Sequence, residues 1–226
     1  GSDGPVKSVR LFSKVRPSDI RTLAFDASSM TSNRLAQIIL SERYGATPST
    51  QTMAPDLSAM LAENDACVLI GDIGMVADGA GLHVLDLGEE WRRLTHKPFV
   101  WAAWIGNEGL TPELSAYLLA GAATTYVGRH REQETWRGKL GKTLMPKVFA
   151  GLPSEEIESV RGRLVQRAVA HAPSWTAEMV RDYYLNVMVY EMTDEVLGGL
   201  REFQRRLFVN GFMDTNHFPA LISPAL

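Results

Sequence analysis

The chain has 226 residues, and 45% of them are hydrophobic, so it can bury a substantial core as one large domain or two small ones. Its net charge of −3 and its dispersed arginines argue against nucleic acid or an anionic membrane surface as a partner. No run of about 20 apolar residues is present, so the sequence predicts no membrane-spanning helix. The single cysteine, Cys67, lies in an apolar run and is expected to be buried, with no internal disulfide possible.

Strands and helices alternate through the first hundred residues. Residues 66–70, ACVLI, are apolar without alternation, which is typical of a central parallel strand covered on both faces. Shorter helices are expected from Pro55, after Gly71 and from Gly88. This alternation favours an α/β fold with a mainly parallel sheet. The strands are expected at residues 7–14, 22–25, 48–53, 66–70, 83–87 and 98–105.

The second half of the chain has a different pattern. Five helices are expected, with starts marked by Pro112, Pro153 and the pair Thr193-Asp194. No strand is expected among them, so this helical part should pack on the sheet or complete a second lobe. The expected helices span residues 112–127, 135–149, 154–172, 176–191 and 194–210.

The most informative stretch is residues 26–45, DASSMTSNRLAQIILSERYG. A buried strand ends here in small hydroxyl residues, and apolar residues then recur at helical spacing until Gly45. Free N–H groups and hydroxyls at a helix start can bind a carboxylate or phosphate. The alternative is that one hydroxyl caps the helix and the others are solvated. The hydroxyl residues are Ser28, Ser29, Thr31 and Ser32.

Several other patterns give no support for a catalytic or metal site. The basic segment 137–143, RGKLGKT, lacks the first glycine of a phosphate-binding loop, and no strand precedes it. The five histidines show no metal-ligand spacing, so no metal and no cofactor are expected. What remains is a set of strand ends, where open α/β sheets bind ligands. These are Ser8, the turn at residues 28–32, Gly71-Asp72 and the turn at Gly88.

Four fragments occur in a characteristic order: SDGPVKSVRLFSK, the SSMTS turn, LIGD and DLGEEWRRLTHKPFVWAAW. Together with DYYLNVMVYEMTDEVLGGLREF near the C-terminus, they resemble the chorismate dehydratase family of the futalosine pathway of menaquinone biosynthesis. The sister family that makes 1,4-dihydroxy-6-naphthoate is the nearest alternative. The resemblance implies a type II periplasmic-binding-protein-like fold, with two α/β lobes, two crossing strands and a ligand cleft between the lobes.

The resemblance also implies a domain division. Residues 1–14 would end the first lobe and form a crossing strand, 15–98 would form the second lobe, and 99–226 would return and complete the first. Members of the family begin with a further strand and an asparagine-containing turn. Because that segment is absent here, we expect either a fragment or a segment supplied elsewhere. Residues 126–174 are longer than the usual connection, and no role is assigned to them.

The activity implied by the resemblance is dehydration of chorismate to 3-[(1-carboxyvinyl)oxy]benzoate, in the cytoplasm and without a cofactor. Ser8 is expected to contact the enolpyruvyl end of the substrate and assist proton transfer. Thr31 and Ser32 would hold a carboxylate, and Ser29 and Gly71 would line the site. Asp72 would orient the C4 hydroxyl, unless it merely caps the next helix.

Two other functions fit the same residues. A solute-binding protein of this fold would carry a small anion without converting it. A chain without the asparagine segment would bind chorismate but not catalyse. Partners other than a small anionic substrate are not expected, and the oligomeric state is not predicted.

Overall fold

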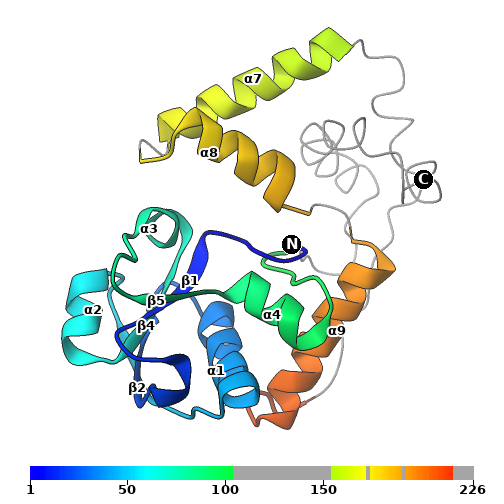
Figure 1. Cartoon of the computed structure of the whole chain (residues 1–226). Helices are drawn as coiled ribbons and strands as arrows, with labels where there is room; N and C mark the ends of the chain where they lie inside the picture. Colours follow the sequence, from blue (N-terminus) through cyan, green and yellow to red (C-terminus); the bar gives the residue numbers. More distant parts are fainter. Residues whose placement is uncertain (104–153, 172–173, 190–191, 216–226) are drawn as a thin grey trace. The chain divides into compact units, whose positions relative to one another are not determined.

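Figure 1 shows the computed structural model, which describes residues 1–103, 154–171, 174–189 and 192–215. The chain divides into two compact units, Gly1–Ala102 with Glu191–Phe218 and Ala103–Tyr190 with Pro219–Leu226. The helices expected at 112–127 and 135–149, and the basic segment 137–143, lie outside the described residues.

A five-stranded sheet lies at the centre of the first unit, in the order β3-β2-β4-β1-β5. β2 runs parallel to β3 and β4, whereas β1 runs antiparallel to both of its neighbours, β4 and β5. The expected α/β class is therefore confirmed, with β1 opposed to the direction of the other strands. The strands are β1 (Val9–Ser13), β2 (Thr22–Asp26), β3 (Ser49–Met53), β4 (Ala66–Ile70) and β5 (His83–Asp86).

Both faces of the sheet are covered. Phe12, Cys67 and Leu69 form a buried cluster with Met60 of α2. Leu11 and Val68 alternate with these residues along the strands, so their side chains point to the opposite face. Both are buried, which means that this face is covered as well. Burial on both sides is the arrangement predicted for residues 66–70. The helices of this part are α1 (Thr31–Tyr44), α2 (Leu57–Glu63), α3 (Gly71–Val76) and α4 (Leu87–Thr95).

The strand expected at residues 98–105 does not form in the described part, residues 98–103. Only Phe99 pairs, in an isolated antiparallel bridge with Ser2 in which each residue donates its N–H to the other's carbonyl at 2.9 Å. The ring of Phe99 packs edge-on against Trp91 and Phe203, with centroids 5.3 Å and 4.9 Å away. The apolar character of this stretch therefore serves aromatic packing rather than strand pairing.

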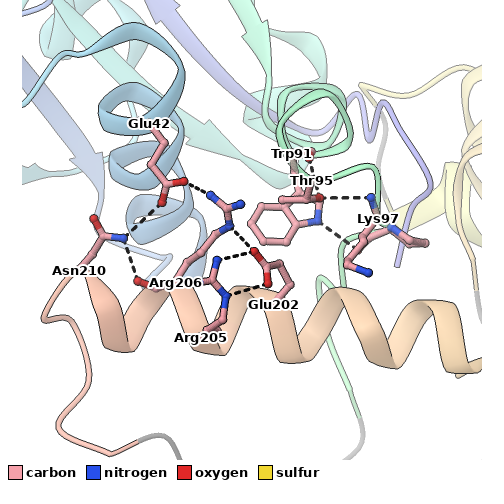
Figure 2. Close-up of polar contacts among 9 residues, drawn as sticks. Glu42, Trp91, Thr95, Lys97, Glu202, Arg205, Arg206 and Asn210 are labelled. Atoms are coloured by element: carbon pink, nitrogen blue, oxygen red, sulfur yellow. Dashed lines mark hydrogen bonds and ion pairs between the residues drawn. The ribbon is translucent and has the colours of Figure 1, made fainter.

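Helix α9 (Asp194–Val209) belongs to the first unit and packs on α1. Figure 2 shows the polar contacts of this helix. Arg206 of α9 forms ion pairs with Glu42 of α1 and, at 2.7 Å, with Glu202 of its own helix. Asn210, just after the helix, donates to Glu42 at 3.4 Å. These contacts fix a helix from the end of the chain to the first hundred residues.

The described part of the second unit is helical. α7 (Ser154–His171) matches the expected helix at 154–172. The helix expected at 176–191 is shorter than predicted, because α8 (Ala177–Asp182) passes into one π-helical turn, Tyr183–Val187. In the described part of the chain, no helix has both the length and the apolar character needed to cross a bilayer.

Cys67, in β4, is buried as expected. Burial, and secondarily the charge of Asp26, raises the pKa of its thiol to about 12. We therefore expect alkylation by iodoacetamide at pH 9 to be much slower in the folded protein than in urea. Equal labelling rates in the folded and the urea-unfolded protein would contradict this prediction.

The raised pKa of Cys67 also affects stability. The neutral thiol contributes stability in full below its unfolded pKa of about 9, and that contribution is lost as the pH rises towards about 12.

Candidate functional site

Several chain segments meet at one edge of the sheet. β2 and β4 run parallel and end at Asp26 and Ile70. β1 runs the opposite way, with Val9 opposite Ile70, so its first residues lie at the same edge as those strand ends. The turns and helices that follow β2 and β4 start there too. This edge therefore holds the predicted site residues Ser8, Ser29, Thr31, Ser32, Gly71 and Asp72.

The turn between β2 and α1 presents hydroxyl groups. Met30 stands at the N-cap of α1 and makes no side-chain capping bond. Instead, Ser29 Oγ accepts the N–H of Ser32 at 3.2 Å, so the hydroxyl proton of Ser29 can be donated to a ligand. Thr31 is exposed, whereas Ser32 is only 5% exposed. Ser29 thus bonds the first turn of α1 from the residue before the N-cap, but the alternative in which the other hydroxyls are solvated does not describe Ser32, which is buried.

Ser8 is held in place by the loop that precedes it. The residue is 4% exposed. The backbone N–H groups of Val6 and Lys7 donate to the carboxylate of Asp86 at 3.0 Å and 2.6 Å. Lys7 has a φ of 66°, a left-handed conformation that costs energy for a residue other than glycine. Asp86 therefore stabilises the unusual backbone that leads into Ser8.

The third segment of the site is the start of α3. Gly71 has a φ of 60° and, like Asp72, is exposed. The N-cap of this helix is Ile70, so Asp72 lies within the first turn and does not cap it. Gly74 is buried, and a Cβ there would lie 2.5 Å from the carbonyl oxygen of Ser8. Glycine is what allows α3 to approach the start of β1 this closely.

Arg10 holds the other end of α3. Its Nε donates to the carbonyl of Gly74 at 2.6 Å, and its Nη2 donates to those of Met75 and Ala77 at 3.0 Å. Burial lowers the pKa of Arg10, and the charge of Asp86 opposes that shift. The side chain satisfies carbonyls at the end of a helix, where a positive charge is favoured.

Two carboxylates at this edge were not predicted from the sequence. Asp26 is 1% exposed and accepts the N–H groups of Ser28 at 2.8 Å and Ile70 at 3.2 Å. Asp86 caps α4 by accepting the N–H of Gly88 at 2.9 Å, in addition to holding the loop before Ser8. Each aspartate is the last residue of a strand, just before a turn or helix. That position is the signal from which both could have been found.

The arrangement suits recognition of a small anion. Hydroxyls and backbone N–H groups gather at the start of α1, where the helix dipole favours negative charge. Among the residues that the structure describes, no group of three or more His, Cys, Asp or Glu is placed to hold a metal ion.

Residues 1–133 match the protein family described as menaquinone biosynthesis. A chorismate dehydratase from Thermus thermophilus is 31% identical over 147 residues, which cover 57% of this chain and 54% of that protein. The chain thus spans about half the length of this relative. The family match extends over more than half of the chain and agrees with the resemblance expected from the sequence. The chain therefore belongs to the menaquinone biosynthesis family, as a relative of chorismate dehydratase.

Proposed function

We propose that the protein is a lyase that dehydrates chorismate to 3-[(1-carboxyvinyl)oxy]benzoate in futalosine-dependent menaquinone biosynthesis. The observation that carries the proposal is the family match over residues 1–133, with a relative named chorismate dehydratase. The hydroxyl-rich edge of the sheet supports it, because chorismate carries two carboxylates that hydroxyl and N–H donors can bind. The cytoplasmic location expected from the resemblance stays a prediction.

The reaction asks for little acid–base chemistry from the protein. Loss of the proton at C3 and of the hydroxyl at C4 makes the ring aromatic, which drives the reaction. The substrate's own enolpyruvyl carboxylate can take up the C3 proton if the ring is held in the correct conformation. Holding reacting groups in place is a recognised source of large rate increases. A site built from hydroxyls and backbone donors is suited to that task.

The proposed roles follow the positions of the residues. Thr31 and Ser32, at the start of α1, hold one substrate carboxylate, with Ser29 beside them. Ser8 contacts the enolpyruvyl end and assists proton transfer. Gly71 and Asp72, at the start of α3, line the site, and the Asp72 carboxylate orients the C4 hydroxyl.

The proposal includes the type II periplasmic-binding-protein-like fold, with residues 15–98 as one lobe. Its support is twofold. β1 enters the sheet against the direction of the other strands, as a segment arriving from elsewhere in the chain would. Ser2 and Phe99, which belong to the segments proposed to leave and to return, also pair in an antiparallel bridge. The boundaries at residues 14 and 98 stay predictions.

Substitution of the α1 start tests the proposed carboxylate contact. Thr31→Val and Ser32→Ala should each weaken chorismate binding by about 1–3 kcal/mol, because each removes a hydrogen bond to a charged group. Calorimetric titration with chorismate measures the affinity, and loss of the cyclohexadiene absorbance measures turnover. Thr47→Val, an exposed change beyond the other end of α1, is the control and should leave both unchanged.

Each result of this experiment has a clear meaning. Unchanged affinity in both variants would reduce the turn to a helix cap and remove it from the site. Binding of chorismate by the unaltered protein without turnover would favour a binding protein over a lyase. Turnover of the sister family's substrate in place of chorismate would assign the protein to that reaction.

A further inference from the structure

Asp26 is a buried carboxylate below the turn of the candidate site. It accepts three hydrogen bonds, from Ser28 N at 2.8 Å, Ser28 Oγ at 2.5 Å and Ile70 N at 3.2 Å. A charge that is 1% exposed is costly to bury unless donors surround it, and these three donors meet that need. Two come from the turn after β2 and one from the end of β4. The carboxylate thus joins the two strand ends from which the site is built.

A second buried side chain holds the same turn from the α1 side. The amide Nδ2 of Asn33 donates to the carbonyl of Asp26 at 3.0 Å and to that of Ser29. The N–H of Ser29 returns to the carbonyl of Asp26 at 3.1 Å, and Asn33 is 6% exposed. The backbone of the turn is therefore held from two sides, by the carboxylate and carbonyl of Asp26 and by the amide of Asn33.

The hydroxyl groups of the two serines have different partners. Ser28 donates both its N–H and its hydroxyl proton inward to Asp26. Ser29 uses its oxygen as an acceptor, for the N–H of Ser32 at 3.2 Å, and keeps its hydroxyl proton for a ligand. Both serines follow the same strand, but the carboxylate of Asp26 accepts the hydroxyl proton of Ser28 and not that of Ser29.

We propose that Asp26 is a positioning residue that orients Ser29 and the start of α1 toward the bound anion and keeps Ser28 out of ligand contact. The inference rests on the proposed function, because it names what arranges the donors of that site. Both carboxylate oxygens of Asp26 already accept hydrogen bonds from Ser28 and Ile70, so its role is to position the turn and not to react with the substrate. It acts through the turn and through the Ile70 N–H beside Gly71.

The serine pair provides the first test. Ser29→Ala should raise the KM for chorismate about tenfold, the loss of one hydrogen bond, with kcat changed less than threefold. Ser28→Ala should change KM less than twofold, because the backbone N–H groups of Ser28 and Ile70 still bind Asp26. Equal effects of the two changes, or the larger effect at Ser28, would overturn the inference.

Asp26→Asn provides the second test. The amide keeps the shape of the side chain but sets an NH2 group against the N–H donors of Ser28 or Ile70. We expect KM to rise at least tenfold at a temperature where circular dichroism shows the variant folded. Amide hydrogen exchange at Ser28 and Ile70 should also become faster. Cys67→Ala, a change in the same buried region, is the control and should alter stability but not KM.

The two proposals fail in different ways. If the unaltered protein neither binds nor converts chorismate, the proposed function fails, whereas amide exchange at Ser28 and Ile70 still tests Asp26 without a substrate. If the unaltered protein converts chorismate and a folded Asp26→Asn variant keeps the same KM and the same exchange rates, the inference fails and the function stands. If Asp26→Asn does not fold, the serine pair decides.

Discussion

Replacement of Asp86 by alanine is expected to lower the free energy of unfolding by about 3 kcal/mol. The carboxylate accepts four backbone N–H groups, two from the loop before Ser8 and two from the first turn of α4. The donors are Val6, Lys7, Gly88 and Glu89. Without it, these donors lose their partner, and Lys7 loses the support for its left-handed backbone. Urea unfolding followed by circular dichroism measures the change.

Asp56 offers a matched control for this experiment. It is also an N-cap aspartate, but among the described residues its carboxylate accepts a single N–H group, that of Ala59 at 2.8 Å, and it is exposed. Asp56→Ala should therefore cost about 1 kcal/mol, the usual value of a helix cap. If the two variants lose the same stability, Asp86 acts as a cap alone and does not hold the loop before Ser8.

The second large effect is expected at Gly199 in α9. A Cβ at this position would overlap the carbonyl oxygen of Pro98, so Gly199→Ala should push α9 away from the segment around Phe99. The ring contacts between Phe203 and both Trp91 and Phe99 depend on that approach. We expect a loss of about 3 kcal/mol, the upper part of the range for overpacking a buried site. Thermal and urea unfolding measure it.

The adjacent Gly198 should respond in the opposite direction. A Cβ there would meet only the Nζ of Lys97, at 3.8 Å, which is an ordinary contact. Alanine is preferred to glycine inside a helix by up to about 1 kcal/mol, so Gly198→Ala should be neutral or stabilising. Destabilisation by both changes would mean that glycine is needed at this point of α9 for a reason other than its contact with Pro98.

The sequence predicted the parts of the fold that depend on local pattern. The run at residues 66–70 is β4 with the same bounds, and the helix before Gly45 ends there with Gly45 at a φ of 66°. Both signals are local, since one is an unbroken apolar run and the other is the freedom of glycine to adopt a left-handed backbone. Ser8 was also expected to lie with these strand ends, but the antiparallel direction of β1 that brings its start there was not predicted from the sequence.

The sequence did not predict features that depend on contacts between distant residues. The apolar stretch after Pro98 has strand composition, but the ring of Phe99 packs against Trp91 and Phe203, which no local pattern reveals. In the sequence, Asp26 and Asp86 resemble ordinary turn residues. Asp26 accepts a hydrogen bond from Ile70, and Asp86 accepts one from Val6, and both donors lie far away in the sequence. The functional roles of Ser8 and Thr31 stay predictions until the variants are measured.

The position of β1 also has a consequence for folding. β2 pairs with both β3 and β4, whereas β1, within the described sheet, pairs with β4 and β5, which are both synthesised later. As the chain leaves the ribosome, β1 has no sheet partner until β4 emerges, and one of its edges stays open until β5 follows. Such an edge can pair with other chains, so β1 is exposed to aggregation during synthesis. The antiparallel placement of β1 brings Ser8 to the site. It also means that the hydrogen bond from Val6 to Asp86 cannot form until Asp86, 80 positions later, has been synthesised.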